Sequence, residues 1–204
     1  MTDEPTPAVN HHGDHGGFSG IPGTLCALAF LLTGRRSARL AADLTAVTAA
    51  DRVVDVGCGP GVAVREATRR GGKATGVDPS ASMLKVGRAV FGRAGITLVE
   101  GEAEALPLPD ASATVVWALA TVHHWRDVGA GLSEAHRVLT SGGRLLAVER
   151  QSPPDATGFK SHGWTQPQSQ AFADLCRAAG FDDVAVGTEP MGRRGVWTVT
   201  ATRP

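Results

Sequence analysis

The segment VVDVGCGPG, residues 53–61, decides the fold that this sequence predicts. A short β-branched run ends in three glycines, Gly57, Gly59 and Gly61, just before a stretch with helical periodicity. Glycines at a strand-to-helix turn let the backbone bend sharply and approach a ligand with no Cβ in the way. The dinucleotide-binding fingerprint has its third glycine where this chain has Val62, so the spacing differs from that fingerprint.

Strand-like and helix-like segments alternate on both sides of this turn. The strand-like segments are short and rich in β-branched or apolar residues. They are RVVDVG (52–57), KATGVD (73–78), ITLVEG (96–101), ATVVWALAT (113–121) and GRLLAVE (143–149). The helix-like segments between them cover residues 62–70, 80–94 and 128–139. This alternation predicts an α/β fold of the Rossmann-like kind, in which helices cover both faces of a mostly parallel sheet.

The C-terminal part changes this pattern. A helix is expected at 169–179, followed by the strand-like segments 183–188 and 195–202 with a short connection between them. Two strands joined in this way form a hairpin, so the last strand should run antiparallel to its neighbour. We therefore expect seven strands, mostly parallel, with an antiparallel C-terminal hairpin strand.

The N-terminal part divides into an arm and two helices. Residues 1–20 contain too many prolines and glycines for a regular element, so we expect a flexible arm or lid there. Residues 24–47 have mostly helical spacing, with a break between two helices at 33–37. The remaining chain, 21–204, has the length of one domain.

Composition limits the expected partners and location. Lys+Arg and Asp+Glu each number 20, which argues against a general electrostatic attraction to nucleic acid. The cysteines Cys26, Cys58 and Cys176 lack the paired spacing of a zinc ribbon or disulfide framework, and favour a reducing cytoplasm. The apolar segment 21–32 is too short to span a membrane and is expected to be a buried helix. We expect a small-molecule partner, neither nucleic acid nor a membrane, and leave a homodimer open.

Asp78 ends the second strand-like segment, about 20 residues after Gly57. At that position a carboxylate can accept hydrogen bonds from both hydroxyls of an adenosine ribose. The alternative is that Asp78 caps the N-terminus of the helix that follows it. Both roles are compatible, because a carboxylate fixed by the backbone is better placed to bind a ligand.

Four motifs in order resemble class I S-adenosylmethionine-dependent methyltransferases of the group that includes ubiquinone-pathway and small-molecule enzymes. They are DVGCGPG (55–61), GVDPSASML (76–84), GEAEALP (101–107) and EAHRVLTSGGRLLAVE (134–149). The resemblance implies S-adenosylmethionine as cofactor, with Asp78 on the ribose, Met83 on the adenine, and Glu102 and Ala103 at the adenine edge. The full implied set of cofactor-binding residues is Asp55, Gly57, Gly59, Gly61, Asp78, Pro79, Met83, Glu102, Ala103 and Ala118.

Two motifs that this chain lacks limit the kinds of chemical group that we expect it to methylate. Methyltransferases of the superfamily that act on base amino groups carry Asn or Asp followed by two prolines after the fourth strand, where this chain reads ALAT (118–121). No paired-glutamate loop of the arginine methyltransferase kind is present either. Hydroxyl, carbon, sulfur and amine centres of small molecules remain.

The segment TVHHW (121–125) supplies the expected catalytic residues. Adjacent residues on an extended chain point to opposite sides, so His123 and His124 are not expected to share a metal. The HWRD stretch resembles family members with a catalytic histidine, which implies His124 as general base, with His123 shaping the pocket. Glu149 ends the neighbouring strand and would orient or charge the pair. The alternative is a partly buried histidine at an ordinary strand-to-helix turn.

Two further segments are expected to bound the substrate site. The loop 150–168 is long enough to suggest a function, with His162 near the acceptor and Trp164 stacking on a sugar or aromatic ring. An ordinary surface connection is the alternative. HHGDHGG (11–17) contains potential metal ligands, but its glycines disfavour fixed coordination, so no metal is expected. Instead the arm would fold over the cofactor, with His15 near the substrate and Phe18 as apolar anchor.

These features together favour O-methylation. The pattern resembles sugar O-methyltransferases, and DHGGFSG (14–20) is similar to small bacterial enzymes that include the sugar 1-O-methyltransferase of methylmannose polysaccharide synthesis. The expected reaction is methyl transfer to a hydroxyl of a small molecule or sugar. A histidine would act as the general base that removes the hydroxyl proton, and a glutamate would assist it. Two alternatives remain: C-methylation of a quinone or polyketide ring, and a regulatory protein that binds the cofactor without catalysis.

Overall fold

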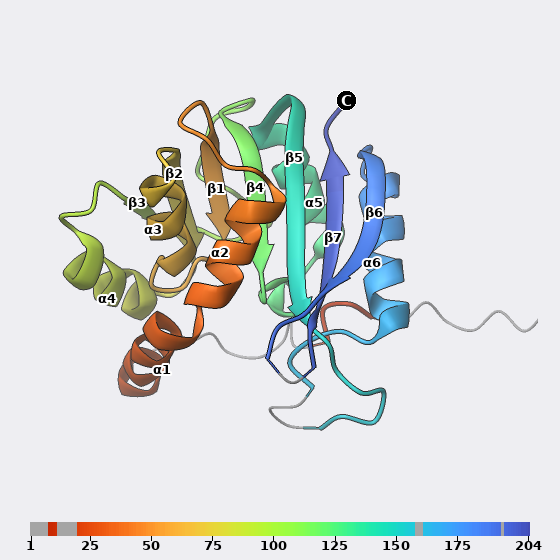
Figure 1. Cartoon of the computed structure of the whole chain (residues 1–204), viewed down its shortest axis with the longest axis horizontal. Helices are drawn as coiled ribbons and strands as arrows, with labels where there is room; N and C mark the ends of the chain where they lie inside the picture. Colours follow the sequence, from red (N-terminus) through yellow and green to blue (C-terminus); the bar gives the residue numbers. More distant parts are fainter. Residues whose placement is uncertain (1–7, 12–19, 158–160, 193) are drawn as a thin grey trace, which may run out of the picture.

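The computed structural model describes residues 8–11, 20–157, 161–192 and 194–204. Its seven strands form one sheet in the order β3-β2-β1-β4-β5-β7-β6. Their bounds are β1 Arg52–Val56, β2 Lys73–Asp78, β3 Thr97–Glu100, β4 Ala113–Leu119, β5 Leu139–Arg150, β6 Asp182–Glu189 and β7 Val196–Thr202. β1 to β5 pair in parallel, whereas β7 is antiparallel to both β5 and β6. The predicted mostly parallel sheet with an antiparallel C-terminal hairpin strand is confirmed (Figure 1).

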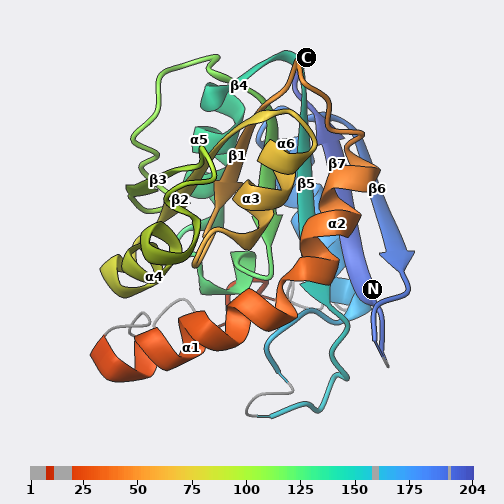
Figure 2. The same ribbon diagram turned by 60° about the vertical axis from the view of Figure 1, so that its left-hand side comes forward.

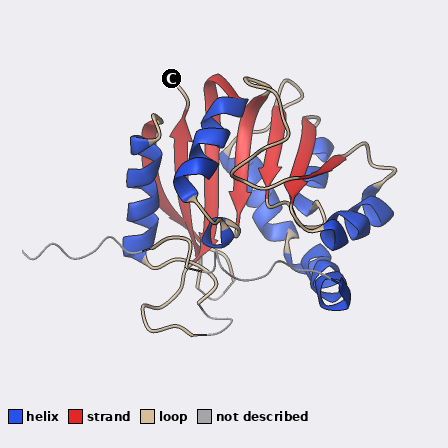
Figure 3. Cartoon of the chain, turned by 180° about the vertical axis from the view of Figure 1, so that it is seen from behind, coloured by secondary structure: helices blue, strands red, loops and turns tan. Residues whose placement is uncertain are grey.

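Helices cover both faces of this sheet because successive strand residues point to opposite faces and both sets are apolar. Val53 and Trp117 pack with residues of α2, α3 and α4, whereas Val54 and Val116 pack with residues of α5 and α6. Figure 3 shows the α5 and α6 side of the sheet from behind. The helix bounds are α1 Gly20–Thr33, α2 Arg35–Leu44, α3 Val62–Arg69, α4 Ala81–Phe91, α5 Val128–Val138 and α6 Gln166–Ala178.

α6 begins three residues before the predicted start at 169. Thr165 is its N-cap, and the side chains of Thr165 and Gln168 satisfy each other's backbone N–H groups in a capping box. Pro167 lies in the first turn, where its missing N–H is not needed. The Pro167 that was interpreted as part of a loop therefore belongs to the helix.

The predicted break between α1 and α2 is confirmed at Gly34, but the predicted burial of 21–32 is wrong. Ala27 is fully buried, whereas Leu25 is 63% and Leu32 is 75% exposed. The reason is that α1 lies beside α4, below the sheet, so only one side of it contacts the domain (Figure 2). Among the described residues, no helix combines the length and the apolar character that crossing a membrane requires.

Parallel strands bring their carboxyl ends to one edge of a sheet, and the strand order reverses between β1 and β4. In Figure 1 the arrowheads of β1, β4 and β5 point to this edge, and α1 and the loop after β5 lie below it. The residues that follow β1, β2, β4 and β5 therefore meet at the place where ligands bind in open α/β sheets.

Candidate functional site

The turn after β1 requires glycine at Gly57. Its φ of +70° is a left-handed backbone conformation, and a Cβ there would lie 2.0 Å from the Thr121 hydroxyl oxygen. The N–H groups of Gly57 and Cys58 both donate to the Val77 carbonyl, at 2.8 and 3.1 Å. The turn is thus held against β2 and against the segment that follows β4. The carboxyl ends of β1, β2 and β4 therefore lie together at one side of the site.

Asp78 is fixed by hydrogen bonds from two backbone N–H groups, one in the glycine turn and one just before α4. Its Oδ2 accepts the Gly59 N–H at 2.7 Å and its Oδ1 accepts the Ser80 N–H at 2.8 Å. Burial raises the pKa of Asp78, and these two hydrogen bonds act against that rise. The N-cap of α4 is Ser80, whose hydroxyl accepts the Met83 N–H, so the alternative that Asp78 caps the helix is wrong. Each Asp78 oxygen keeps a lone pair for a further donor.

Asp55 carries the other carboxylate near the turn, and its Oδ1 is buried with no hydrogen-bond partner among the described residues. Burial raises the pKa of Asp55 to about 8, and the charge of Asp78 adds to the rise. A buried acceptor without a donor lowers stability unless a ligand satisfies it. Asp55 is therefore suited to a cationic or hydrogen-donating ligand.

We expect Asp55→Asn to gain stability relative to the parent protein as the pH rises. In the unfolded chain this carboxyl group ionises near about pH 4. In the folded protein it stays protonated up to about pH 8, so rising pH favours unfolding across that window. The asparagine amide does not ionise, so the variant does not lose stability in this way as the pH rises. In cofactor-free thermal unfolding, the difference in Tm between variant and parent should grow from about pH 4 to about pH 8 and then level off. A difference that stays constant over this range would contradict the buried protonated state.

The remaining predicted cofactor residues fall into two groups. The first group lies near the turn: Met83 is buried with its sulfur facing Gly59, and Glu102 is half-exposed and pairs with Arg126 at 3.2 Å. Pro79 is exposed in the connection between β2 and α4. In contrast, the side chains of Ala103 and Ala118 lie in the apolar core on the α5 side of the sheet. Only their backbone is available to a ligand, because their side chains are enclosed.

Two residues beside the turn were missed by the sequence analysis. Phe30 of α1 lies 3.8 Å from where a Gly59 Cβ would be, and Thr121 packs against Gly57. α1 therefore supplies a wall of the site from a segment that was expected to be core. A contact of this kind joins residues far apart in the chain, and only the apolar character of Phe30 could have suggested it.

The histidines after β4 do not lie on an extended chain. Ala120 has a left-handed φ of +54°, and Val122–His124 then form a 3₁₀-helix, η1. The rings of His123 and His124 come within 4.1 Å of each other between centroids. The prediction that they point to opposite sides is wrong, because a 3₁₀ turn rotates adjacent side chains by about a third of a turn instead of half.

Glu149 holds His123. Both carboxylate oxygens of Glu149 lie 3.0 Å from the His123 Nδ1, and the two side chains are 0% and 3% exposed. The prediction placed Glu149 at this edge beside the histidine pair, and the structure directs it to His123. A carboxylate can only accept here, so the His123 Nδ1 carries the N–H that donates to Glu149, and the other ring nitrogen, Nε2, is directed away from the carboxylate.

The loop after β5 brings His162 to the same place. The Trp164 N–H donates to the Arg150 carbonyl at 2.8 Å, and the Ser152 N–H donates to the Trp164 carbonyl at 2.8 Å. These bonds close the loop onto the end of β5. The His162 ring lies 5.5 Å from the His123 ring and 5.6 Å from the His124 ring, between centroids.

Trp164 does not face a ligand. Its side chain is fully buried, packs against Phe172 at 4.9 Å between ring centroids, and donates its indole N–H to the Val9 carbonyl at 3.0 Å. The predicted stacking on a sugar or aromatic ring is therefore wrong in this structure. The large apolar ring completes the core between α6 and the N-terminal segment, which the loop assignment did not anticipate.

Part of the N-terminal arm lies beside the histidines. Val9 is buried, the Asn10 amide donates to the Trp125 and Arg126 carbonyls, and His11 Nε2 lies 2.8 Å from the Ser161 carbonyl oxygen. The His11 ring stacks 6.0 Å from the His123 ring. His15 and Phe18 lie outside the described residues, so the predicted lid over the cofactor stays a prediction.

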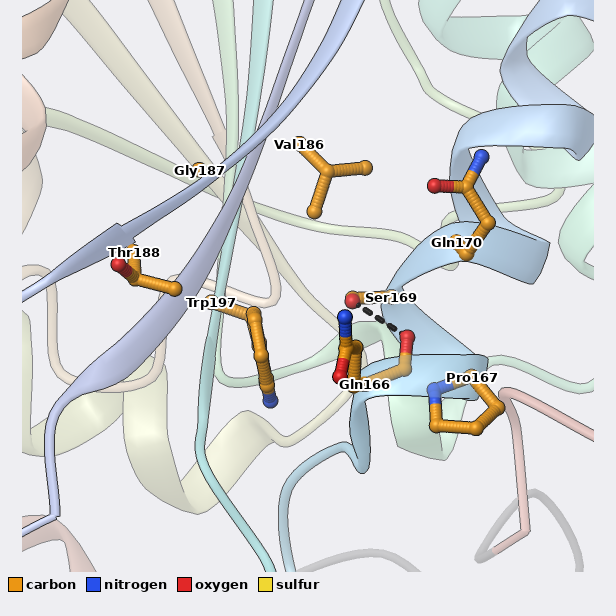
Figure 4. A pocket seen from close by; sticks show the side chains of 8 residues that line it. All are labelled: Gln166, Pro167, Ser169, Gln170, Val186, Gly187, Thr188 and Trp197. Carbon is orange, nitrogen blue, oxygen red and sulfur yellow. Dashed lines mark hydrogen bonds between the residues drawn. The ribbon is translucent and has the colours of Figure 1, made fainter.

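A separate hollow lies between α6 and the β6–β7 hairpin. Figure 4 shows its lining, with the Ser169 hydroxyl donating to the Gln166 carbonyl at 2.7 Å. It is lined by Gln166, Pro167, Ser169, Gln170, Val186, Gly187, Thr188 and Trp197. This lining contains no ionisable side chain, and it belongs to the far edge of the sheet from the glycine turn. The ionisable side chains that could bind a cofactor or take part in catalysis lie instead at the carboxyl edge of the sheet.

Comparison with known proteins agrees with this geometry. The family described as "Methyltransferase domain" matches residues 54–147. The ubiquinone/menaquinone biosynthesis C-methyltransferase UbiE of Rubrivivax gelatinosus is 36% identical over 177 residues, covering 74% of this chain and 68% of that protein. The 27-O-demethylrifamycin SV methyltransferase of Amycolatopsis mediterranei is 35% identical over 134 residues, or 63% of this chain and 49% of that protein. The chain thus spans about half the length of the rifamycin relative.

Solved structures show the same fold at low sequence identity. A chain of the complex between the Haloferax volcanii Trm112 methyltransferase activator and the putative methyltransferase matches with a TM-score of 0.77 at 19% identity, covering 97% of this chain and 98% of that one. A putative S-adenosyl-L-methionine-dependent methyltransferase from Methanococcus maripaludis matches with a TM-score of 0.74 at 18% identity, covering 93% and 95%.

The residues at the carboxyl edge fit the cofactor that these relatives share. The turn at Gly57–Gly61 exposes backbone, Asp78 can accept two hydroxyls, and the unpaired oxygen of Asp55 suits a ligand that carries positive charge. The resemblance read from the four motifs is thereby confirmed at the level of the family. The chain belongs to the S-adenosylmethionine-dependent methyltransferases, and S-adenosylmethionine is its cofactor.

Proposed function

We propose that this protein transfers the methyl group of S-adenosylmethionine to a hydroxyl of a small molecule or sugar. The observation that carries the proposal is the buried Glu149–His123 pair with His124 beside it. The pair lies at the same sheet edge as the glycine turn, and it supplies nitrogen acceptors for a proton. A carbon nucleophile with an acidic ring position has less need of such an acceptor than an alcohol does.

The cofactor supplies a methyl group already activated by its sulfonium charge, so alignment is the main requirement. The backbone at Gly57–Gly61 and the carboxylate of Asp78 would hold its nucleoside, because both are fixed by the hydrogen bonds to β2 and α4. His124 would accept the hydroxyl proton. Glu149 orients His123, and His123 in turn limits how the His124 ring can turn.

C-methylation of a quinone or polyketide ring is the second candidate, and it is supported by the similarity to UbiE. The rifamycin relative bears the name of a methyltransferase acting on a 27-O-demethyl compound, so the relatives by themselves favour neither atom. The histidine cluster favours oxygen. A regulatory protein that binds cofactor without turnover is a third candidate.

The product decides between these candidates. We expect S-adenosylmethionine labelled with ¹³C at the methyl group to give a methoxy product on a panel of sugars, hydroxylated small molecules and quinones. NMR distinguishes a methoxy carbon from a methyl group bonded to carbon. A C-methyl product would overturn the proposal in favour of the second candidate. Cofactor binding with no product on any acceptor would favour the third.

The cytoplasm is the proposed location. The three cysteines are all free thiols, with Cys58 and Cys176 buried in the domain. Burial raises the pKa of Cys176 to about 12, so its thiol is inert. Free structural thiols without a disulfide are typical of a reducing compartment.

A further inference from the structure

Histidine is concentrated at one place in this molecule. The chain has 7 histidines, and four described ones, His11, His123, His124 and His162, form a ring cluster at the carboxyl edge of the sheet. They come from three separate segments, namely the N-terminal segment, η1 and the loop after β5. One acid–base residue would account for one histidine at this edge, and the cluster contains more than that function needs.

Three of these histidines have the arrangement of metal ligands. One ring nitrogen each of His123, His124 and His162 lies within 4.8 Å of the other two. In a tetrahedral site with metal–nitrogen bonds of about 2.1 Å, ligand nitrogens lie about 3.4 Å apart. Ring shifts of less than about 1 Å would therefore close the cluster around an ion. His124 and His162 are only partly buried, so an ion can enter.

Glu149 adds a second, independent feature of metal sites. It is fully buried and bonds His123 Nδ1, which directs the other ring nitrogen of His123 away from the carboxylate. Histidine ligands usually donate their second N–H to a carboxylate or carbonyl, which fixes the ring and makes it a better ligand. A buried glutamate in this position has a clear role behind a metal-bound imidazole.

The geometry points to a binding site for a divalent transition-metal ion, with His123, His124 and His162 as ligands and a fourth position open to the acceptor oxygen. An all-imidazole set suits Zn²⁺, Co²⁺ or Ni²⁺, and it does not suit Mg²⁺ or Ca²⁺, which prefer oxygen ligands. Three protein ligands with an open position are typical of catalytic zinc sites.

This inference rests on the proposed function only for the position of the acceptor. An ion lowers the pKa of a hydroxyl that binds to it, and the released proton passes to water. While the His124 ring nitrogen binds the ion it cannot accept that proton, so His124 acts as general base only in the metal-free protein. Metal binding can therefore fail while hydroxyl methylation stands, and the reverse also holds.

Cobalt titration of the chelator-treated, full-length protein tests the site. We expect one Co²⁺ per chain, with the visible absorption of a four-coordinate ion, and its displacement by Zn²⁺. His162→Ala and His124→Ala should each weaken Co²⁺ binding by at least about 100-fold, since each removes a ligand. Glu149→Gln should weaken it by about 10-fold to 100-fold, because it leaves the three ligands but removes the carboxylate.

His136→Gln is the matched control. His136 is the one described histidine outside the cluster, on α5 with its ring against Phe181. This variant should bind Co²⁺ as the parent does. Parental Co²⁺ affinity in His162→Ala would show that the ion binds elsewhere and would overturn the site, and so would an equal loss in His136→Gln and His162→Ala, because the loss would then not depend on the ligands. Less than about 0.1 Co²⁺ per chain in the parent protein at micromolar concentration would overturn it as well.

Discussion

Replacing His124 with alanine should lower kcat for the hydroxyl acceptor by at least about 100-fold, the range typical of losing a general base. The same loss follows if His124 acts as a metal ligand, because either role depends on its ring nitrogen. His124 lies after β4, outside the glycine turn, and the Asp78 carboxylate is held by the Gly59 and Ser80 N–H groups, so the affinity for S-adenosylmethionine should change little. Single-turnover transfer of a labelled methyl group measures the rate, and calorimetry measures the affinity.

The burial of the Glu149–His123 pair decides which variants can serve as controls for this prediction. Removing either partner of the buried Glu149–His123 pair breaks a buried hydrogen bond, which typically costs about 1–3 kcal/mol of stability. Glu149→Gln is therefore a better test of this residue than Glu149→Ala, because glutamine keeps the shape of the side chain and one amide oxygen. His136→Gln should keep the parental kcat. Near-parental kcat in His124→Ala would leave alignment alone as the mechanism.

Asp78→Ala should weaken S-adenosylmethionine binding by about 1.5–3 kcal/mol, or roughly 10-fold to 150-fold in Kd. Two losses contribute: the ribose hydroxyls lose a charged acceptor, and the Gly59 and Ser80 N–H groups lose the carboxylate that fixes the turn. Calorimetry on parent and variant proteins measures the change.

Asp78→Asn separates the two losses. The amide keeps one oxygen for the turn and removes the charge, so its effect should lie between those of the parent and of alanine. Full parental affinity in Asp78→Ala would contradict the assignment of this carboxylate to the ribose.

Local sequence patterns predicted the parts of the fold that depend on neighbours in the chain. The run from Val53 to Gly61 marks its own strand and turn, because β-branched residues and glycines impose those conformations directly. The order of strands and helices followed from periodicity in the same way. Gly34 likewise marked the break between α1 and α2.

Local sequence patterns could not predict the contacts between segments that lie far apart in the chain. Ala120 adopts a left-handed conformation that its residue type does not signal, and it turns the chain into the 3₁₀-helix of the histidines. Trp164 is buried because Val9 and Phe172 come to it from elsewhere in the chain. Phe30 reaches the glycine turn only because α1 lies beside α4.

The central claim is that an acceptor hydroxyl is methylated at the histidine cluster beside the glycine turn. A crystal structure with S-adenosylhomocysteine and a trapped acceptor tests it most directly. We expect the acceptor oxygen within about 2.6–3.2 Å of the His124 ring nitrogen, or bound to an ion that this nitrogen holds. An acceptor seated in the hollow between α6 and the β6–β7 hairpin, or one that presents a ring carbon to the cofactor sulfur with no oxygen near His124, would contradict the claim.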